Sequence, residues 1–343
     1  MPETHVAWSI HPLGNSLAGY QSVWDELNAE LYASHAYFDS RTVDALLAHF
    51  ASGSERLCVH QRGTEVDGLL IAAPTGIGQW SLFLPSQAQV VPVLLRQAES
   101  LLELPRALPG FACWLNLLSQ DPFYSPVLEG FRPLLNGPLR HDHTICVRLA
   151  GAFKDYWRMR PANLRRAVSR GLRKAVAAGF VVRLEHKMAL ADMPSAVARF
   201  GAIESAGWKG RSGTAVHEDN EQGHFYVELM QKFAASGNAS VYELYFNDIC
   251  VAMLLAIASP SMLVLLKTTY DERYATFSPG QLMLHALLER EFAAKRVQLV
   301  DFYTNVHVDQ MAWATDERWI SHYMLFRNQM VKNIYNIFNK LRR

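Results

Sequence analysis

The order of predicted elements occurs twice along this chain of 343 residues, and this repeat restricts the possible fold more than any other feature. In the second half, two helices precede a hairpin, a single strand, a third helix and a last strand. Their expected bounds are 192–207 and 218–235, then 241–258, 262–269, 279–294 and 297–303. Apolar side chains at helical or strand spacing, separated by Gly and Pro residues, define these elements.

The first half has the same order. Two helices, a hairpin, a strand, a helix and a last strand are predicted at 21–32, 41–51, 57–73, 80–84, 87–104 and 111–118. Because the identity between the halves is negligible, the shared order alone favours tandem copies of one fold. We predict an α/β chain with a mixed sheet, built from one domain at 1–150 and a second at 151–343.

The balance of charged and apolar residues excludes several classes of protein. The chain has 33 Lys and Arg against 32 Asp and Glu, so it is not a globally basic nucleic-acid binder. No apolar run approaches the roughly 18 residues of a membrane span. The N-terminal residues lack the basic start and apolar core of a secretory signal. A cytoplasmic protein is expected.

The spacing of cysteine and histidine does not predict a metal site. The four cysteines, at 58, 113, 146 and 250, are too far apart for a Cys-x-x-Cys motif or a disulfide framework. His141-x-His143 places two imidazoles on one strand face, but no third ligand is evident. We therefore expect no metal cofactor.

The most charged stretch lies between the two copies. A basic linker helix is predicted at 158–178, with an apolar face formed by Leu164, Val168, Leu172 and Val176. Its basic face, between Arg158 and Lys174, is either solvated or a binding surface for an anionic partner such as a nucleotide, a tRNA or a polyphosphate headgroup. The basic, amphipathic segment 332–343 also indicates contact with an anionic surface.

The clearest local motif is Ser278-Pro279-Gly280-Gln281, at the start of the third helix of the second half. Ser at the N-cap, Pro at the first helical position and Gln at the third form a capping-box pattern. Gly280 has no side chain, so a phosphate can approach the free N–H groups of the first helical turn. Taken alone, the motif predicts either a well-capped helix or a phosphate site.

Several further motifs lie in the second half. They are Glu204 with Trp208-Lys209-Gly210, the Asn247-Asp248 turn, Tyr270-Asp271-x-x-Tyr274, Asp301-Phe302 and Trp313-Ala314-Thr315. With Ser278-Pro279-Gly280, they make residues 153–326 resemble the GNAT superfamily of acyltransferases, in particular its FemAB-like and CelD-like branch. The tandem order of elements extends this likeness to the whole chain.

The resemblance implies a divided sheet whose opening holds the pantetheine arm of an acyl-CoA such as acetyl-CoA, with the pyrophosphate on the helix after the central strand. The residues expected at this donor site are Lys267, Thr268, Ser278, Pro279, Gly280 and Gln281. The sequence departs from the family's usual Arg/Gln-x-x-Gly-x-Gly/Ala phosphate loop, since only Ser278-Pro279-Gly280 stands there. Some FemAB-like relatives take an aminoacyl group from tRNA instead, so both donors stay open.

Acyl transfer to an amine needs one group that accepts a proton and one that returns it to the leaving thiolate. Asp301, a carboxylate in an otherwise apolar strand, is the predicted acceptor, and Tyr303 on the same side is the predicted donor. Glu204 is the second catalytic candidate, with the task of orienting the amine. The predicted substrate contacts are Trp208, Lys209, Tyr270, Asp271 and Trp313.

These motifs predict an acyl-CoA-dependent N-acyltransferase that acts on an amine of a small molecule or of a cell-envelope or polysaccharide precursor. The site is expected in the cleft between the copies. The first copy is expected to be degenerate, because it has Leu84-Pro85-Ser86-Gln87 in place of Ser278-Pro279-Gly280-Gln281. Two alternatives stay open: an aminoacyl-tRNA-dependent transferase that uses the basic helix, and a non-catalytic binding protein with a dead site.

Overall fold

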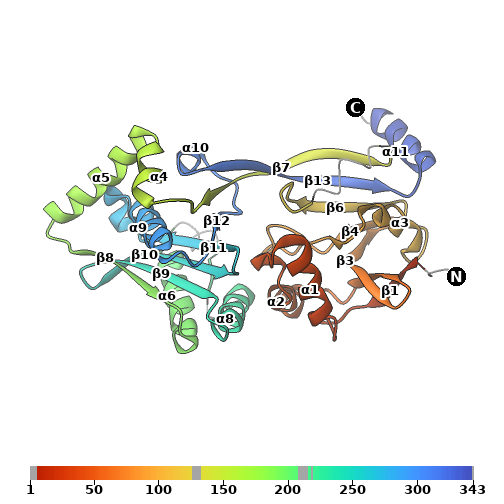
Figure 1. Cartoon of the computed structure of the whole chain (residues 1–343), viewed down its shortest axis with the longest axis horizontal. Helices are drawn as coiled ribbons and strands as arrows, with labels where there is room; N and C mark the ends of the chain where they lie inside the picture. Colours follow the sequence, from red (N-terminus) through yellow and green to blue (C-terminus); the bar gives the residue numbers. More distant parts are fainter. Residues whose placement is uncertain (1–5, 126–132, 208–214, 218, 342–343) are drawn as a thin grey trace. The chain divides into compact units, whose positions relative to one another are not determined.

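The computed structural model describes residues 6–125, 133–207, 215–217 and 219–341. Two compact units make up the chain: unit 1 is Met1–Thr144 with Arg318–Arg343, and unit 2 is Ile145–Glu317. The chain passes between the units within two long strands, β7 (Leu135–Arg148) and β13 (Asp316–Phe326) (Figure 1).

Unit 1 begins with a strand that the sequence analysis did not predict, and the predicted two helices and hairpin follow it. Its elements are β1 (Val6–Pro12), α1 (Gln21–Tyr32), η1 (Ala36–Phe38), α2 (Ser40–Phe50), β2 (Arg56–Arg62), β3 (Glu65–Gly76), β4 (Gln79–Leu82), β5 (Leu94–Leu95), η2 (Ala98–Leu102), α3 (Leu104–Ala107), β6 (Trp114–Gln120) and α11 (Gln329–Leu341). The Asp39 carboxylate caps α2 by accepting the N–H of Arg41. Gly63 closes the β2–β3 hairpin with a positive φ of 65°, which favours glycine.

Unit 2 repeats this order with longer helices. Its elements are α4 (Phe153–Met159), α5 (Ala162–Ala177), β8 (Val182–Lys187), η4 (Leu190–Asp192), α6 (Met193–Ala206), α8 (Glu221–Ala234), β9 (Ala239–Phe246), β10 (Ile249–Ala258), β11 (Met262–Tyr270), η5 (Glu272–Phe277), α9 (Pro279–Ala294), β12 (Leu299–Asp301) and α10 (Val308–Met311). Helix α9 has the predicted bounds, since Pro279 suits the first helical position and the pattern of apolar residues ends before Lys295.

The pairing of strands confirms the repeated order. Thirteen strands of the described chain form one mixed sheet in the order β1-β2-β3-β4-β6-β13-β7-β12-β11-β10-β9-β8, with β5 beside β3. In unit 1, β1 to β4 pair antiparallel and β6 joins β4 in parallel. In unit 2, β8 to β11 pair antiparallel and β12 joins β11 in parallel.

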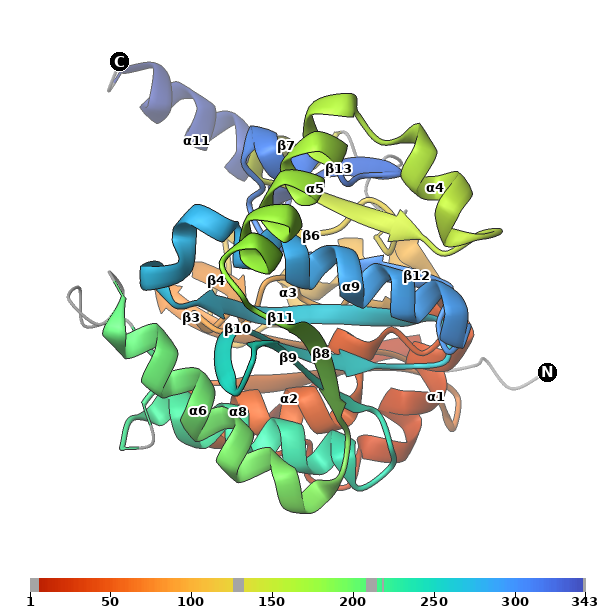
Figure 2. The ribbon, with the colours of Figure 1, turned by 90° about the vertical axis from the view of Figure 1, so that its left-hand side faces the viewer.

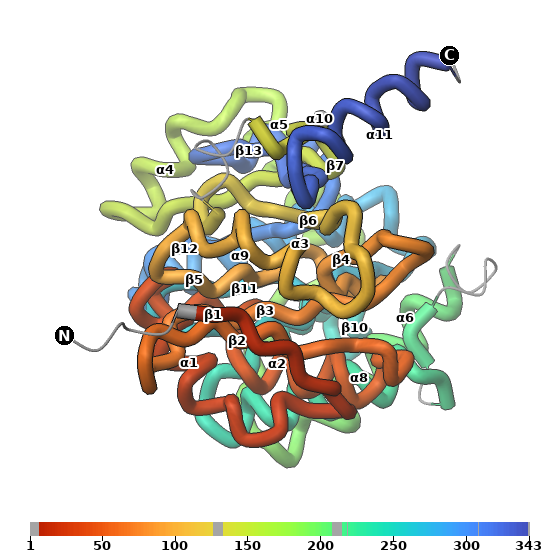
Figure 3. The backbone as a smooth tube through the Cα atoms, turned by 90° about the vertical axis from the view of Figure 1, so that its right-hand side faces the viewer, coloured from red at the N-terminus to blue at the C-terminus, as the bar shows by residue number. Residues whose placement is uncertain are grey.

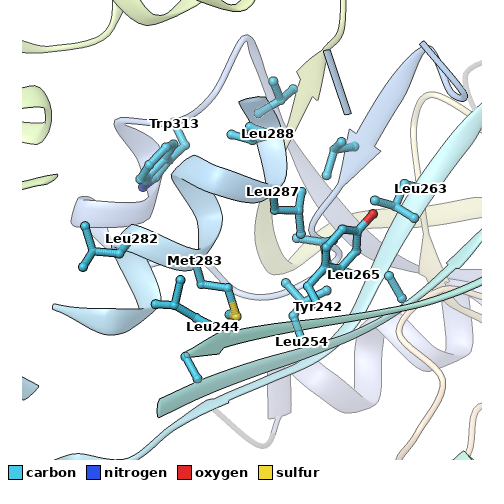
Figure 4. Close-up of a cluster of buried hydrophobic side chains, with 14 of the residues drawn as sticks. Tyr242, Leu244, Leu254, Leu263, Leu265, Leu282, Met283, Leu287, Leu288 and Trp313 are labelled. Atoms are coloured by element: carbon cyan, nitrogen blue, oxygen red, sulfur yellow. The ribbon is translucent and has the colours of Figure 1, made fainter. Parts of the chain in front are cut away.

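Helices cover both faces of the sheet in unit 2. Figure 2 shows α5 and α9 on one face and α6 and α8 on the other. Beneath α9, its residues Leu282, Met283 and Leu287 pack on side chains of β9, β10 and β11, including Leu254 and Leu265 (Figure 4). This core fixes the start of α9 next to the end of β11, which is where the sequence places the donor site.

The predicted helix at 87–104 is wrong. This segment contains the short strand β5 and the 3₁₀ helix η2. Pro92 lacks an N–H and disfavours a helical conformation at Val91, so a continuous helix would lose a hydrogen bond there. Leu94 and Leu95 instead pair with Leu69 and Gly68 of β3.

Candidate active site

The sheet of unit 2 opens between its two parallel strands. β11 and β12 pair only where Met262–Val264 lie opposite Leu299–Asp301, and β11 then continues alone on this side to Tyr270. Asp301 therefore forms the last rung before the strands part. The sheet is therefore divided at this point, as the resemblance to GNAT acyltransferases implies.

A β-bulge in β11 changes the direction of Lys267. Leu265 pairs with Ala256 of β10, but Lys267 pairs with the adjacent Leu255, so Leu266 is an extra residue in the ladder. Leu265 faces the core beneath α9. Without the bulge Lys267 would face the same core, because side chains two residues apart share one face of a strand.

The bulge instead directs Lys267 toward a buried carboxylate between α6 and α8. The Nζ of Lys267 lies 3.8 Å from Oε2 of Glu204 and 5.6 Å from the ring centroid of Tyr226. It also donates a hydrogen bond of 3.4 Å to Oε1 of Gln222. The Glu204 side chain is 1% exposed, and its Oε2 accepts the N–H of Val216 at 2.7 Å. These contacts compensate for burying the carboxylate.

A pocket of about 70 Å³ lies beside this pair, where α6 and β11 end. Its lining residues are Ile203, Glu204, Gly207, Thr268, Thr269, Tyr270 and Glu272. A Cβ at Gly207 would stand 3.1 Å from Oε1 of Glu272, so the glycine leaves room for that carboxylate. Two carboxylates in one lining favour a ligand group that is an amine or a cation.

The first turn of α9 is not capped as predicted. Ser278 has a left-handed backbone (φ 55°, ψ 53°), and its side chain makes no capping hydrogen bond. Its N–H donates to the carbonyl of Ala275, and its carbonyl accepts the N–H groups of Gln281 and Leu282. Ser278 thus ends η5 and begins α9 at one residue. The capping-box interpretation is wrong, because a side-chain cap needs a non-helical, typically extended backbone at the N-cap.

Gly280 nevertheless lies in open space, as a phosphate site would need. Within the described residues no heavy atom outside the helix lies within 4 Å of a Cβ built at Gly280. Just before it, the carbonyl of Phe277 packs against α5, where a Cβ at Gly171 would stand only 2.5 Å from that oxygen. Close packing of α5 therefore holds the start of α9 while its outer side stays accessible.

The predicted helix at 158–178 is divided, because α4 ends at Met159 and α5 begins only after Pro161. Helix α5 also has a narrower apolar face than predicted. Its buried residues are Leu164, Val168, Gly171 and Ala175. Leu172 and Val176, which we predicted on the apolar face, are 42% and 60% exposed. Gly171 and Ala175 are buried in place of Leu172 and Val176, because small residues let the backbone of α5 approach the neighbouring chain closely.

The basic side of α5 lines a groove of about 540 Å³. Its residues are Ala162, Arg165, Arg166, Ser169 and Arg173. Three guanidinium groups along one groove give it the charge that an anionic ligand requires. Arg160, from the same basic stretch, instead donates to the carbonyls of Trp313 and Ala314 and holds the chain before β13.

Asp301 is fully buried on the side of the sheet that α6 and α8 cover. Its neighbours Val300 and Phe302 belong to the core beneath α9, so alternation along the strand directs Asp301 to the opposite face. Its Oδ1 accepts the N–H of Tyr303 at 3.3 Å. Tyr303 is also buried and has a positive φ of 40°, which is uncommon for an aromatic residue. Such conformations cluster at functional sites.

Comparison with known proteins agrees with this geometry. Residues 162–316 match the family model of the acetyltransferase (GNAT) domain. The match covers most of unit 2. No curated protein matches the sequence.

Three solved structures with the same fold extend the comparison to both units. FemX has a TM-score of 0.62 at 10% identity, over 95% of this chain and 99% of that chain. The C-terminal domain of a putative lysylphosphatidylglycerol synthetase from Agrobacterium fabrum has a TM-score of 0.57 at 11% identity, over 92% and 95%. The L-PGS from Bacillus licheniformis has a TM-score of 0.52 at 12% identity, over 91% and 94%. The predicted resemblance to FemAB-like GNAT proteins is confirmed as a likeness of fold.

The remaining predicted residues of the GNAT domain lie in different surroundings. Tyr270 is 44% exposed and lines the pocket, together with Thr268. Asp271 accepts hydrogen bonds from the guanidinium of Arg273, which lowers the pKa of its carboxyl. Trp313 is buried in the core of unit 2, while Trp208 and Lys209 lie outside the described residues. The predicted roles of these residues in substrate binding stay predictions.

Sequence reasoning missed three residues of the candidate site. Tyr226 and Gln222 of α8 contact Lys267, and Glu272 lines the pocket. Glu272 follows the Tyr270-Asp271 motif directly, so its position was the one available signal. Nothing in the sequence singles out Tyr226, because an aromatic residue in an amphipathic helix is ordinarily part of a core. No group of three possible metal ligands occurs in the part of the chain that the structure describes.

Proposed function

We propose that unit 2 transfers an acyl group from a thioester donor to the amine of an acceptor. The observation that carries this proposal is the opening of the sheet beside Asp301 within a GNAT domain. An extended donor arm can enter between two strands that have parted and present its carbonyl to groups on the α6–α8 side. Most of the rate enhancement then comes from holding the amine and the carbonyl together.

The donor is proposed to lie along β11 with its phosphates at the start of α9. The open space outside Gly280 permits contact between a phosphate and the backbone, and the positive end of the helix dipole attracts it. Ser278, Pro279 and Gln281 shape this turn, and Thr268 lies further along β11 beside the pocket. Acetyl-CoA is the first donor to test.

The acceptor amine is proposed to bind in the pocket beside Glu204. The carboxylates of Glu204 and Glu272 hold the amine, and Lys267 keeps Glu204 in place through their ion pair. Asp301 accepts the proton that the amine loses as it attacks the carbonyl, and Tyr303 returns a proton to the departing thiolate. Both groups are buried, so this proposal requires that the bound substrates reach them through the opening.

The basic groove on α5 favours a second candidate donor. Arg165, Arg166 and Arg173 line a groove that is larger than the amine pocket and suits a polyanion. An aminoacyl-tRNA is such a donor, and it carries an acyl ester in place of a thioester. In that case the basic helix would bind the nucleic acid while the same opening received the aminoacyl group.

A thermal-shift series tests both candidates. Acetyl-CoA, longer acyl-CoAs and tRNA are added separately, and a ligand present at about 100 times its Kd should raise the unfolding free energy by about 2.7 kcal/mol. Stabilisation by acyl-CoA, followed by thiol release with an added amine, is the result expected. Stabilisation by tRNA alone would favour the second donor. Binding without turnover for any amine tried would leave a non-catalytic binding protein.

A further inference from the structure

Helix α11 exposes a continuous apolar stripe. Its residues Met330, Ile334, Ile337, Phe338 and Leu341 recur at helical spacing and are 64%, 46%, 59%, 62% and 77% exposed. In a folded domain such a stripe normally faces a core. Here the helix extends away from the strands of unit 1 (Figure 3).

The other side of α11 holds the helix on unit 1. The Tyr335 ring packs against Phe326 and Trp114, with centroids 5.2 Å and 5.5 Å away. Val331 is buried, and the Nζ of Lys332 donates to the carbonyls of Pro133 and Leu135. The apolar stripe is therefore held outward by defined contacts.

All the charged residues of the segment that carries the stripe are basic. Residues 327–343 contain Arg327, Lys332, Lys340, Arg342 and Arg343, and no Asp or Glu. Because the whole chain has 33 basic and 32 acidic residues, the rest of it is net acidic. The basic excess is thus concentrated at the segment that carries the stripe.

Further exposed apolar side chains lie near the start of α11. The N–H of Arg327 donates to the carbonyl of Cys113, and its guanidinium lies 4.6 Å from the ring centroid of Phe111, which is 62% exposed. The N–H of Cys113 in turn donates to the carbonyl of Gly78, the residue after the fully exposed Ile77. These contacts place the exposed side chains of Phe111 and Ile77 in the region of unit 1 from which α11 begins.

We propose that α11 lies in the surface of an anionic lipid bilayer, with the stripe in the acyl region and the basic residues at the headgroups. Apolar and basic side chains together are the requirements for such binding. The helix is about 20 Å long and does not cross a hydrocarbon core of about 30 Å. No helix in the described ranges has the length and apolar composition to span a bilayer. A second copy of α11 is a poor partner, because two helices with no acidic residue repel each other.

Sedimentation with vesicles tests this proposal independently of any transferase activity. The full chain should bind vesicles of phosphatidylcholine mixed with phosphatidylglycerol, and bind those of phosphatidylcholine alone far less. Replacing two stripe residues in the variant Ile337→Ser/Phe338→Ser should lower the bound fraction by about tenfold or more. Lys340→Glu should lower it severalfold, and more at low salt.

The matched control replaces equally exposed apolar residues of unit 2. Met159→Ser/Val181→Ser should sediment with vesicles like the wild-type chain. Equal binding to both vesicle types, or no effect of the stripe substitutions, would overturn the proposal. So would a wild-type dimer in sedimentation velocity that Ile337→Ser/Phe338→Ser converts to monomer, since the stripe would then be an interface between copies. All of these side chains are exposed, so unchanged melting temperatures are expected.

Discussion

The two units pair their strands in the same order, and they differ in the chain that joins their parallel strands. In unit 2, η5 and the helix α9 lead from β11 to β12. In unit 1, an irregular segment with β5, η2 and α3 leads from β4 to β6. A long helix at this place presents one open helix start to a ligand, and unit 1 has no equivalent among its described residues. The scaffold is repeated, whereas the donor site proposed on it is not.

The last residue pair between the two parallel strands also differs between the units. In unit 2 it joins Val264 to Asp301, and in unit 1 it joins Ser81 to Asn116. The Nδ2 of Asn116 donates to Oγ of Ser81 at 2.9 Å, so this amide serves the packing of unit 1. An Asn cannot accept a proton from an amine, and an Asp can. The comparison predicts that acid–base chemistry belongs to unit 2 alone.

The largest effect is expected when Asp301 of unit 2 is replaced by Asn, the residue that unit 1 has at the equivalent position, Asn116. Asp301→Asn keeps the size of the side chain and removes the proton acceptor, so kcat should fall by about 10²–10⁴ while KM for the donor barely changes. The measurement is steady-state thiol release with the donor and amine that the thermal-shift series identifies. A melting curve of the same variant shows whether the fold is retained.

The matched control alters the corresponding residue of unit 1. Asn116→Ala should leave kcat unchanged, although the loss of its hydrogen bond to Ser81 lowers the stability by about 1 kcal/mol. Full activity of Asp301→Asn combined with an inactive Glu204→Gln would exchange the two proposed roles. A large loss of kcat in Asn116→Ala would contradict the assignment of the chemistry to unit 2.

A second test concerns the contact that holds the start of α9. Gly171→Ala places a methyl group 2.5 Å from the carbonyl oxygen of Phe277, and backbone cannot move aside as a flexible side chain can. Overpacking of this kind costs about 1–3 kcal/mol, although alanine gains about 1 kcal/mol in helix propensity. Denaturant unfolding should show a net loss. Gly280→Ala, with open space around its Cβ, is the control and should show none.

Local patterns in the sequence predicted most helices and hairpins correctly, since the residues that define them are close together. Helices α1 and α9 have the predicted bounds because apolar periodicity and a helix-starting Pro or a breaking Gly or Ser are local signals. Pairing between distant strands has no such signal. Strand β13, most of which belongs to unit 1, pairs with β6 of the same unit although the two strands are far apart in the sequence, and the end of β7 pairs with β12. No local feature of these strands indicates their partners.

The candidate site was predicted less completely than the fold, and the β-bulge is the reason for one difference. Simple alternation along β11 puts Lys267 with Leu263 and Leu265 on the core side, whereas one inserted residue directs it to Glu204. The charge of Lys267 in an apolar strand was the only warning in the sequence. Ser278 shows the same limit, because its residue type predicts a cap but its left-handed backbone depends on η5.

A third test compares a glycine substitution at the proposed phosphate site of unit 2 with one in unit 1. Gly280→Val fills the open space through which a phosphate would approach, so the Kd for acyl-CoA should rise by about tenfold while the melting temperature changes little. Titration calorimetry gives the affinity. Gly14→Val in unit 1 is the control, because Gly14 is equally open. Unchanged affinity in Gly280→Val would contradict the assignment of the phosphates to α9.

The smallest effect is expected from the basic face of α5, which the two donors use differently. Reversal of three exposed charges, Arg166→Glu, Arg170→Glu and Arg173→Glu, should lower kcat/KM for acyl-CoA only a few-fold, because the groove attracts the donor from a distance without holding it. Salt screens this attraction, so the kcat/KM values of the variant and the wild type should converge as ionic strength rises.

Substitution of the same residues by Gln should give an intermediate loss of kcat/KM. Equal rates at low salt would mean that the basic face is merely solvated. A loss of two orders of magnitude in kcat/KM with tRNA as donor would instead identify the groove as the binding surface for a polyanion. In that case both α9 and α5 would contribute to donor binding in unit 2.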